Sequence, residues 1–216
     1  MAQTFSRNAN VLFNVVIIGS ALFAAGAIAL LMGLERSRYA TDVGTAQVQP
    51  IQFSHEHHVA NLGIHCAYCH SSVEVSARAG IPPTHTCMTC HSQIYSTSQM
   101  LEPVRASYRT GQSIEWNRVY DLPEFVYFNH SIHVNKGIGC SSCHGRVDQM
   151  NLIYKSGSLQ MQWCLDCHRS PEKHIRPREL VFQMDYQPPA DQEELGKKLM
   201  AEYKVQRLLD CYTCHR

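Results

Sequence analysis

Residues 53–70 read FSHEHHVANLGIHCAYCH, and residues 128–144 read FNHSIHVNKGIGCSSCH. Both stretches contain F-x-H-x-x-H-V, then a Gly-Ile pair, then C-x-x-C-H, and each is followed by a second C-x-x-C-H motif. Self-similarity at a fixed offset marks a repeated structural unit. The chain is therefore predicted to contain two modules and a shorter tail, at residues 53–91, 128–168 and 185–216.

Every cysteine of the chain belongs to this pattern. The ten cysteines form five C-x-x-C pairs, and a histidine follows each pair directly. C-x-x-C-H is the attachment signature of a c-type haem, in which two thiols bind one macrocycle and the histidine ligates its iron. We therefore expect five haem c groups, held by Cys66, Cys69 and His70; Cys87, Cys90 and His91; Cys140, Cys143 and His144; Cys164, Cys167 and His168; and Cys211, Cys214 and His215.

Zinc binding and disulfide formation are the alternatives for so many cysteines. A zinc site needs paired C-x-x-C sets that close a tetrahedron, and it does not need five following histidines. A redox-active dithiol occurs once, near a βαβ pattern. The spacing favours haem over both alternatives.

The N-terminal part of the chain contains a long uncharged segment. Residues 11–33 carry no charged side chain, and as a helix they are about 34 Å long, enough for a hydrocarbon core of roughly 30 Å. The apolar region of a cleaved signal peptide is shorter, about 7–15 residues. We therefore expect residues 11–34 to form a transmembrane anchor rather than a cleaved signal.

The orientation of this anchor follows from haem chemistry. Flanking charges do not decide it, because arginines lie on both sides of the segment. Attachment of c-type haem takes place outside the energy-coupling membrane, so the chain after the anchor has to be translocated. We expect a bacterial inner-membrane protein with one span, residues 1–10 in the cytoplasm and residues 35–216 in the periplasm.

The haem region is expected to have little regular structure, because five haems supply much of a hydrophobic core. The predicted fold class is a multihaem cytochrome c, mostly irregular, with short α-helices around the haems and one N-terminal transmembrane helix. Residues 92–127 show no lasting period and are predicted to be irregular. Residues 191–210 have acidic residues in the first turn and apolar residues near helical spacing, which predicts a helix.

Four histidines are candidates for the second axial position of an iron. His55 and His58 precede the first motif, and His130 and His133 precede the third at matching distances. A spacing of three places both imidazoles on one face of a helical turn, where each can reach a different haem. Recurrence ahead of a C-x-x-C-H motif favours ligation over a surface or core role.

The fifth iron then needs another ligand. The candidates are Met150, Met161, His85 and His174, and we favour a methionine without choosing between the two. A thioether ligand would raise the reduction potential of that haem above its bis-histidine neighbours. His57 and His65 are expected not to be ligands.

The H-x-x-H and C-x-x-C-H arrangement resembles the multihaem cytochromes of the c3/c7 type. The resemblance implies that the first histidine of a pair binds the haem of the following motif and that the second reaches a neighbouring haem. His55 would then serve the Cys66/Cys69 haem, and His130 the Cys140/Cys143 haem.

A second resemblance covers nearly the whole chain. The anchor, the two histidine boxes, GRVDQMNLIY, LQMQWCLDCHR and the terminal CYTCHR are similar to the pentahaem subunit of bacterial alternative complex III. The resemblance implies an electron-transfer component of a quinol:electron-acceptor oxidoreductase. It implies as partners an iron–sulfur protein, quinol-oxidising membrane subunits and a monohaem cytochrome c, with a cytochrome c or terminal oxidase as acceptor.

Three functions were weighed. The first is this electron-transfer role, with no catalytic site in the chain itself. The second is a stand-alone membrane-anchored quinol dehydrogenase feeding a periplasmic reductase, against which the haem count of five stands. The third is a catalytic multihaem reductase, which needs an open iron, whereas the chain has candidate ligands for every iron. A net charge of +1 gives no reason to expect nucleic acid as a partner.

Overall fold

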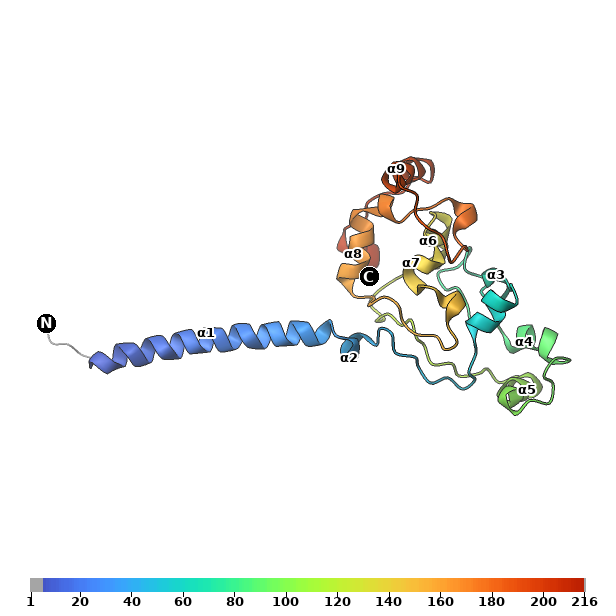
Figure 1. The fold of residues 1–216 in the computed structure, drawn as a ribbon, viewed down its shortest axis with the longest axis horizontal. Coiled ribbons are helices and arrows are strands. Elements are labelled where there is room, and N and C mark those ends of the chain that lie inside the picture. The colour runs from blue at the N-terminus through green and yellow to red at the C-terminus, as the bar shows by residue number, and fades with distance from the viewer. Residues whose placement is uncertain (1–5, 216) are drawn as a thin grey trace. The chain divides into compact units, whose positions relative to one another are not determined.

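The computed structural model describes residues 6–215, and the chain divides into two units, Met1–Asp42 and Val43–Arg216. The first unit contains the long helix α1 (Arg7–Glu35) and the single turn α2 (Arg38–Thr41) (Figure 1). Asp42 ends α2 in the left-handed conformation, with φ 55°. Of the predicted cytoplasmic segment 1–10, residues 1–5 lie outside the described residues, and the part from Arg7 onward is already helical.

Helix α1 matches the predicted span in place and in character. Residues 8–35 are long enough and apolar enough to cross a membrane, and a signal sequence has the same properties. Large apolar side chains such as Phe13, Ile17 and Phe23 are mostly exposed on it. An α-helix satisfies its own backbone hydrogen bonds, which a chain in lipid requires.

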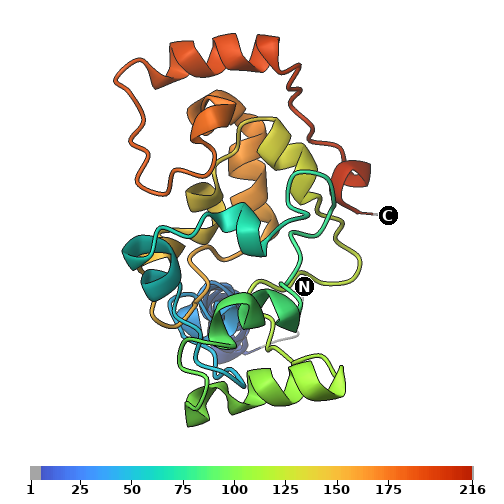
Figure 2. The ribbon, with the colours of Figure 1, turned by 90° about the vertical axis from the view of Figure 1, so that its right-hand side faces the viewer.

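The second unit is built from short helices joined by long loops (Figures 1 and 2). Its described helical segments are η1 (Glu56–Asn61), α3 (Cys66–Cys69), α4 (Thr84–His91), η2 (Gln99–Leu101), α5 (Glu102–Thr110), α6 (His130–Asn135), α7 (Cys140–His144), η3 (Val147–Gln149), α8 (Met161–Arg169), η4 (Pro171–Lys173), η5 (Arg178–Leu180), α9 (Gln192–Glu202) and α10 (Cys211–Cys214).

Extended pairing is sparse in this unit. Within residues 43–215 the backbone forms isolated bridges, such as Ile138 with Ile175 and Val126 with His215, and no ladder. Two small apolar clusters serve as the protein core. One is centred on Val73, Val134 and Val181, and the other on Ile175, Leu199 and Tyr203. The predicted picture of short helices in an irregular chain is confirmed.

The two copies of the repeat differ in length by one residue, and a different type of helix in each copy accommodates this difference. Eight positions separate His58 from Cys66, whereas seven separate His133 from Cys140. The longer copy folds as the π-helix η1, and the shorter copy folds as the α-helix α6. A π-helix accommodates an inserted residue without changing the chain direction and is frequent at functional sites.

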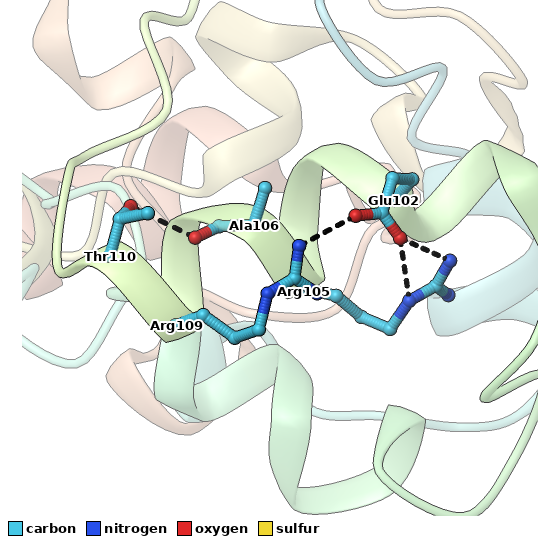
Figure 3. A network of polar contacts seen from close by, with 5 residues as sticks. All are labelled: Glu102, Arg105, Ala106, Arg109 and Thr110. Carbon is cyan, nitrogen blue, oxygen red and sulfur yellow. Dashed lines mark hydrogen bonds and ion pairs between the residues drawn. The ribbon is translucent and has the colours of Figure 1, made fainter.

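The prediction that residues 92–127 are irregular was wrong for α5. This helix begins with Glu102 and Pro103 and ends at Gly111, which has φ 71°. Proline in the first turn and glycine after the last are helix boundary signals. Glu102 accepts from Arg105 at 2.7 Å and from Arg109 at 2.8 Å on the exposed side (Figure 3), while Val104 and Ser107 are buried.

The predicted helix at residues 191–210 is real but shorter. Helix α9 ends at Glu202, since Lys204 takes the left-handed conformation with φ 54°. The amide of Val205 then donates to the carbonyl of Met200 at 2.9 Å, which wraps the chain back over the helix end. Helix α9 packs on η4 (Figure 2), and a Cβ at Gly196 would overlap with the backbone carbonyl of Glu172.

Candidate cofactor-binding centres

All five C-x-x-C-H motifs lie on helical segments. The motif cysteines begin α3, α7 and α10 and lie within α4 and α8. A spacing of three residues on a helical turn puts both thiols on one side of the helix. No two of the ten cysteines form a disulfide with each other.

The thiols have the character of buried groups rather than of reactive ones. Burial raises the pKa of Cys140 to about 11 and that of Cys143 to about 12. Catalytic and metal-binding cysteines have a lowered pKa, because the thiolate is the reactive form. Across the described residues no group of three or more His, Cys, Asp or Glu is placed to hold a metal ion.

Three pairs of imidazoles lie at nearly the same separation. The ring centres of His58 and His91 are 6.3 Å apart, and those of His133 and His168 are 6.2 Å apart. The rings of His130 and His144 are 6.4 Å apart and 16° from parallel. Two metal–nitrogen bonds of about 2 Å and the two ring radii add up to about 6 Å, so each pair has room for one metal between its rings.

Five of the six imidazoles in these pairs are oriented by backbone carbonyls. The Nδ1 atom of His130 lies 2.9 Å from the oxygen of Ala77, and that of His168 lies 3.0 Å from the oxygen of Leu208. A proton on Nδ1 that is donated to a carbonyl fixes the tautomer and leaves Nε2 free for a metal. The same contact is made by His58 to Ser54, His70 to Gly80, His91 to Ile94, His133 to Asn129 and His215 to Phe125.

Burial also lowers the pKa of some of the histidines in this region, His144 and His55 most of all. Burial first, and the neighbouring histidines second, lower the pKa of His144 to about 4. Burial first, then His70 and His58, lower the pKa of His55 to about 4. A histidine binds metal in its neutral form. His70 is among the charged neighbours that lower the pKa of His55, and the Nδ1 atom of His55 is buried without a hydrogen-bond partner.

The phenylalanine that opens each repeat packs on both histidines of its pair. Phe53 stacks on His58 at 4.4 Å and meets His55 edge-on at 4.9 Å. Phe128 stacks on His133 at 4.4 Å and meets His130 edge-on at 4.8 Å. The sequence reasoning did not give these phenylalanines a role, although the F-x-H-x-x-H pattern contained the signal.

The fifth motif returns to the second module. Tyr127 donates its amide to the carbonyl of Cys214 at 2.8 Å, and His215 forms a bridge with Val126. Cys214 also contributes to the raised pKa of Cys164, after burial, so motifs four and five are neighbours. The tail predicted at residues 185–216 is thus packed against the second module, as far as it is described.

The other candidates for the fifth iron lie in different settings. Met161 is 67% exposed at the start of α8, one turn before Cys164. Met150 is 4% exposed, and its carbonyl accepts from the amide of Glu56. His85 lines an open cavity of about 620 Å³ between α4 and the end of α5 with the chain that follows it. His174 follows η4, and burial first, then Lys173, lower its pKa.

The two histidines that were expected not to be ligands have other contacts. The Nδ1 atom of His65 accepts the amide of Ala67 at 3.2 Å, which caps α3, and its ring packs on Phe182. His57 touches His58 edge-on at 5.2 Å. The assignment of axial ligands by residue stays a prediction.

Comparison with known proteins agrees with this geometry. Residues 126–216 match the family model of cytochrome c7 and related cytochrome c, a stretch that includes motifs three to five. Over 97 residues the chain is 36% identical to the multihaem cytochrome c subunit of a menaquinone reductase from Nitratidesulfovibrio vulgaris. That match covers 44% of this chain and 45% of the relative, less than half the length of either.

The resemblance to the c7 type is therefore confirmed over residues 126–216. Similarity to this family supports a multihaem cytochrome c fold for this part of the chain and implies electron transfer by covalently bound c-type haem.

Proposed function

We propose that this chain, with its c7-type cytochrome domain, is the pentahaem electron-transfer subunit of a membrane respiratory complex of the alternative complex III type. It would relay electrons from quinol oxidation to a cytochrome c or a terminal oxidase. The observation that carries the proposal is the set of three imidazole pairs at 6.2–6.4 Å, in which five of the six rings lie within hydrogen-bond distance of a backbone carbonyl.

The chain's own residues set up each centre. The ten cysteines would tether five haems, and the paired imidazoles would fill both axial positions of an iron. A bound c-type haem supplies one-electron redox chemistry at its iron. Imidazoles already fixed by carbonyls need little rearrangement between oxidation states, and they leave no open position for a substrate. Relay rather than catalysis is the chemistry that this arrangement supports.

The proposed axial pairs follow the ring geometry and the repeat. His58 pairs with His91, His130 with His144, and His133 with His168. His55 pairs with His70, its neighbour in the first module. His215 is then left for a ligand of another kind.

We assign Met161 rather than Met150 to that position. Met161 is exposed on α8, the helix that carries Cys164, and Cys164 lies near Cys214 of the fifth motif. Met150 is buried beside Gly145 of the second module, 3.9 Å from the position of a Cβ there, where it fills space.

Helix α1 would anchor the chain in the inner membrane, with residues 43–216 in the periplasm. The partners proposed from the resemblance are an iron–sulfur protein, quinol-oxidising membrane subunits and a monohaem cytochrome c. An uncleaved α1 predicts that the chain purified from membranes keeps its N-terminal segment, which intact mass measures together with the haem count.

A second candidate has a specific observation in its favour. The relative that shares 36% identity is named as a subunit of a menaquinone reductase. A chain of this second type would carry electrons toward the quinone pool rather than away from it.

The decisive experiment is purification from membranes in mild detergent. The proposal predicts five haems per chain by pyridine haemochrome assay, several co-purifying subunits, and haem reduction by added quinol. Haem oxidation by added quinone, with no reduction by quinol, would favour the menaquinone-reductase direction. A chain that comes alone and oxidises quinol would instead be the stand-alone dehydrogenase.

A further inference from the structure

Arg176 is a buried cation without a counter-charge. Three charged side chains are buried in the described part of the chain: Asp148, Glu172 and Arg176. Asp148 pairs with Arg146 at 2.7 Å, and Glu172 pairs with Arg207 at 3.1 Å. Within residues 6–215, no carboxylate forms an ion pair with Arg176, which is 6% exposed. A guanidinium stays charged when it is buried.

The charge is bound to the third haem motif itself. One terminal nitrogen of Arg176 donates to the hydroxyls of Ser141 at 3.2 Å and Ser142 at 3.3 Å, the two residues between the cysteines of CSSCH. The other terminal nitrogen donates to the carbonyl of Gln183 at 3.0 Å. The Nε atom is buried and has no hydrogen-bond partner, so the guanidinium is neither neutralised nor fully satisfied.

The surroundings hold this cation in place. The ring of Tyr186 lies 4.2 Å below its Cζ atom, a favourable cation–π position. On the other side is Gly139, where a Cβ would overlap with the guanidinium. The amide of Arg176 donates to the carbonyl of Gly137 at 2.9 Å. Glycine is therefore required at position 139 for the guanidinium to lie against the motif.

The first copy of the repeat lacks this arrangement. The residue before its first cysteine is His65, which caps α3 through Nδ1. The residues between its cysteines are Ala67 and Tyr68, and the hydroxyl of Tyr68 contacts Thr89 at 3.0 Å. The two copies thus share axial geometry but differ in the charge placed beside the haem attachment.

We propose that Arg176 tunes the reduction potential of the haem on Cys140 and Cys143, raising it above that of the corresponding haem on Cys66 and Cys69. Reduction adds one electron to the iron, so a nearby fixed positive charge stabilises the reduced form. Because Arg176 is buried, salt and solvent screen this effect little. The proposal rests on the proposed function only in requiring haem at the third motif.

The test is a redox titration of each haem in the purified complex, followed by absorbance and EPR. Arg176→Gln removes the charge, and it should lower the reduction equilibrium constant of one haem at least tenfold, which is about 59 mV for one electron. Arg176→Lys keeps the charge and should restore most of the value. Arg118→Gln is the control, because the side chain of Arg118 is 66% exposed beside Asp121. This variant should leave the reduction equilibrium constant of every haem within twofold of the wild-type value.

A second pair of variants keeps the arginine in place. Ser142→Asp sets a carboxylate against the guanidinium and should lower the same haem's constant at least tenfold, whereas Ser142→Asn should change it less than threefold. The haem that moves is identified as the low-spin signal that disappears in His130→Ala. The proposal would be overturned if the reduction equilibrium constant of this haem stayed within twofold of wild type in both Arg176→Gln and Ser142→Asp. It would also be overturned if the constants of all haems shifted equally. If the proposed function is wrong, the purified protein would instead have a haem count other than five or would lack the partner subunits.

Discussion

The imidazoles of His130 and His144 face each other at 6.4 Å, with their planes 16° from parallel. They come from different helices, α6 and α7, and the chain between them is only a short turn. One repeat thus supplies both rings of one centre. The second histidine of this repeat, His133, faces His168 of the next motif. His130 and His133 lie on one helical turn, so that turn connects two centres.

Removing a histidine of such a pair should open one iron. His58→Ala takes away the ring opposite His91, so we expect one haem to become high-spin and to bind CO while the others remain low-spin. EPR and CO difference spectra measure this. His57→Ala is the matched control, because His57 neighbours His58 but faces no motif histidine. A fully low-spin, CO-insensitive His58→Ala protein contradicts the assignment.

The phenylalanine of each repeat should matter for stability more than for ligation. Phe128→Ala removes two ring contacts, which we expect to cost about 1–2 kcal/mol of unfolding free energy while the haem spectrum stays low-spin. Denaturant titration followed at the Soret band gives the value. Tyr108→Ala, on the exposed side of α5, should cost less than 0.5 kcal/mol, as surface changes do. Equal costs for the two variants would remove the special role of Phe128.

The fifth centre can be identified by its sulfur ligand. Met161→Leu should abolish the near-infrared charge-transfer band of methionine-ligated haem and lower the highest potential of the set, because a thioether ligand raises potential. Met150→Leu should leave the band in place. Wild-type spectra with five bis-histidine signatures would exclude both methionines and reopen His85 and His174 as ligands.

Acid should weaken the protein through Glu172. A backbone hydrogen bond and, next, Arg207 lower the pKa of Glu172 below its ordinary value of 4.5. A carboxylate with a lowered folded pKa contributes stability above its unfolded pKa, and this contribution is lost as the pH falls through the folded pKa. The stability gap between wild type and Glu172→Gln should therefore be constant near pH 7 and shrink below pH 4.5. Denaturant titrations across this range test it; a gap that widens in acid contradicts the sign.

Much of the site could be predicted from the sequence because it is encoded locally. A cysteine spacing or an H-x-x-H pair lies within one turn of chain, so the motif and the helix face follow from neighbouring residues. The duplicated boxes added a comparison within the chain itself. Helix α1 followed in the same way from a continuous apolar run.

Other features depend on contacts or on single residues. The carbonyl partners of His130 and His168 come from residues 53 and 40 positions away, which no local pattern reveals. The end of α9 depends on the left-handed backbone of Lys204, a residue without a strong preference for it. Helix α5 was not predicted, although Pro103 and Gly111 mark its ends, because residues 92–127 as a whole show no lasting apolar period.

The contact between His130 and Ala77 joins the two copies of the repeat. Ala77 belongs to the first copy and accepts from both the amide and the ring of His130 in the second copy. The two copies of the repeat are therefore no longer equivalent, because the second depends on a carbonyl of the first for the position of His130. This carbonyl lies 53 residues before His130 in the chain, so the second copy relies on the first to orient one of its rings.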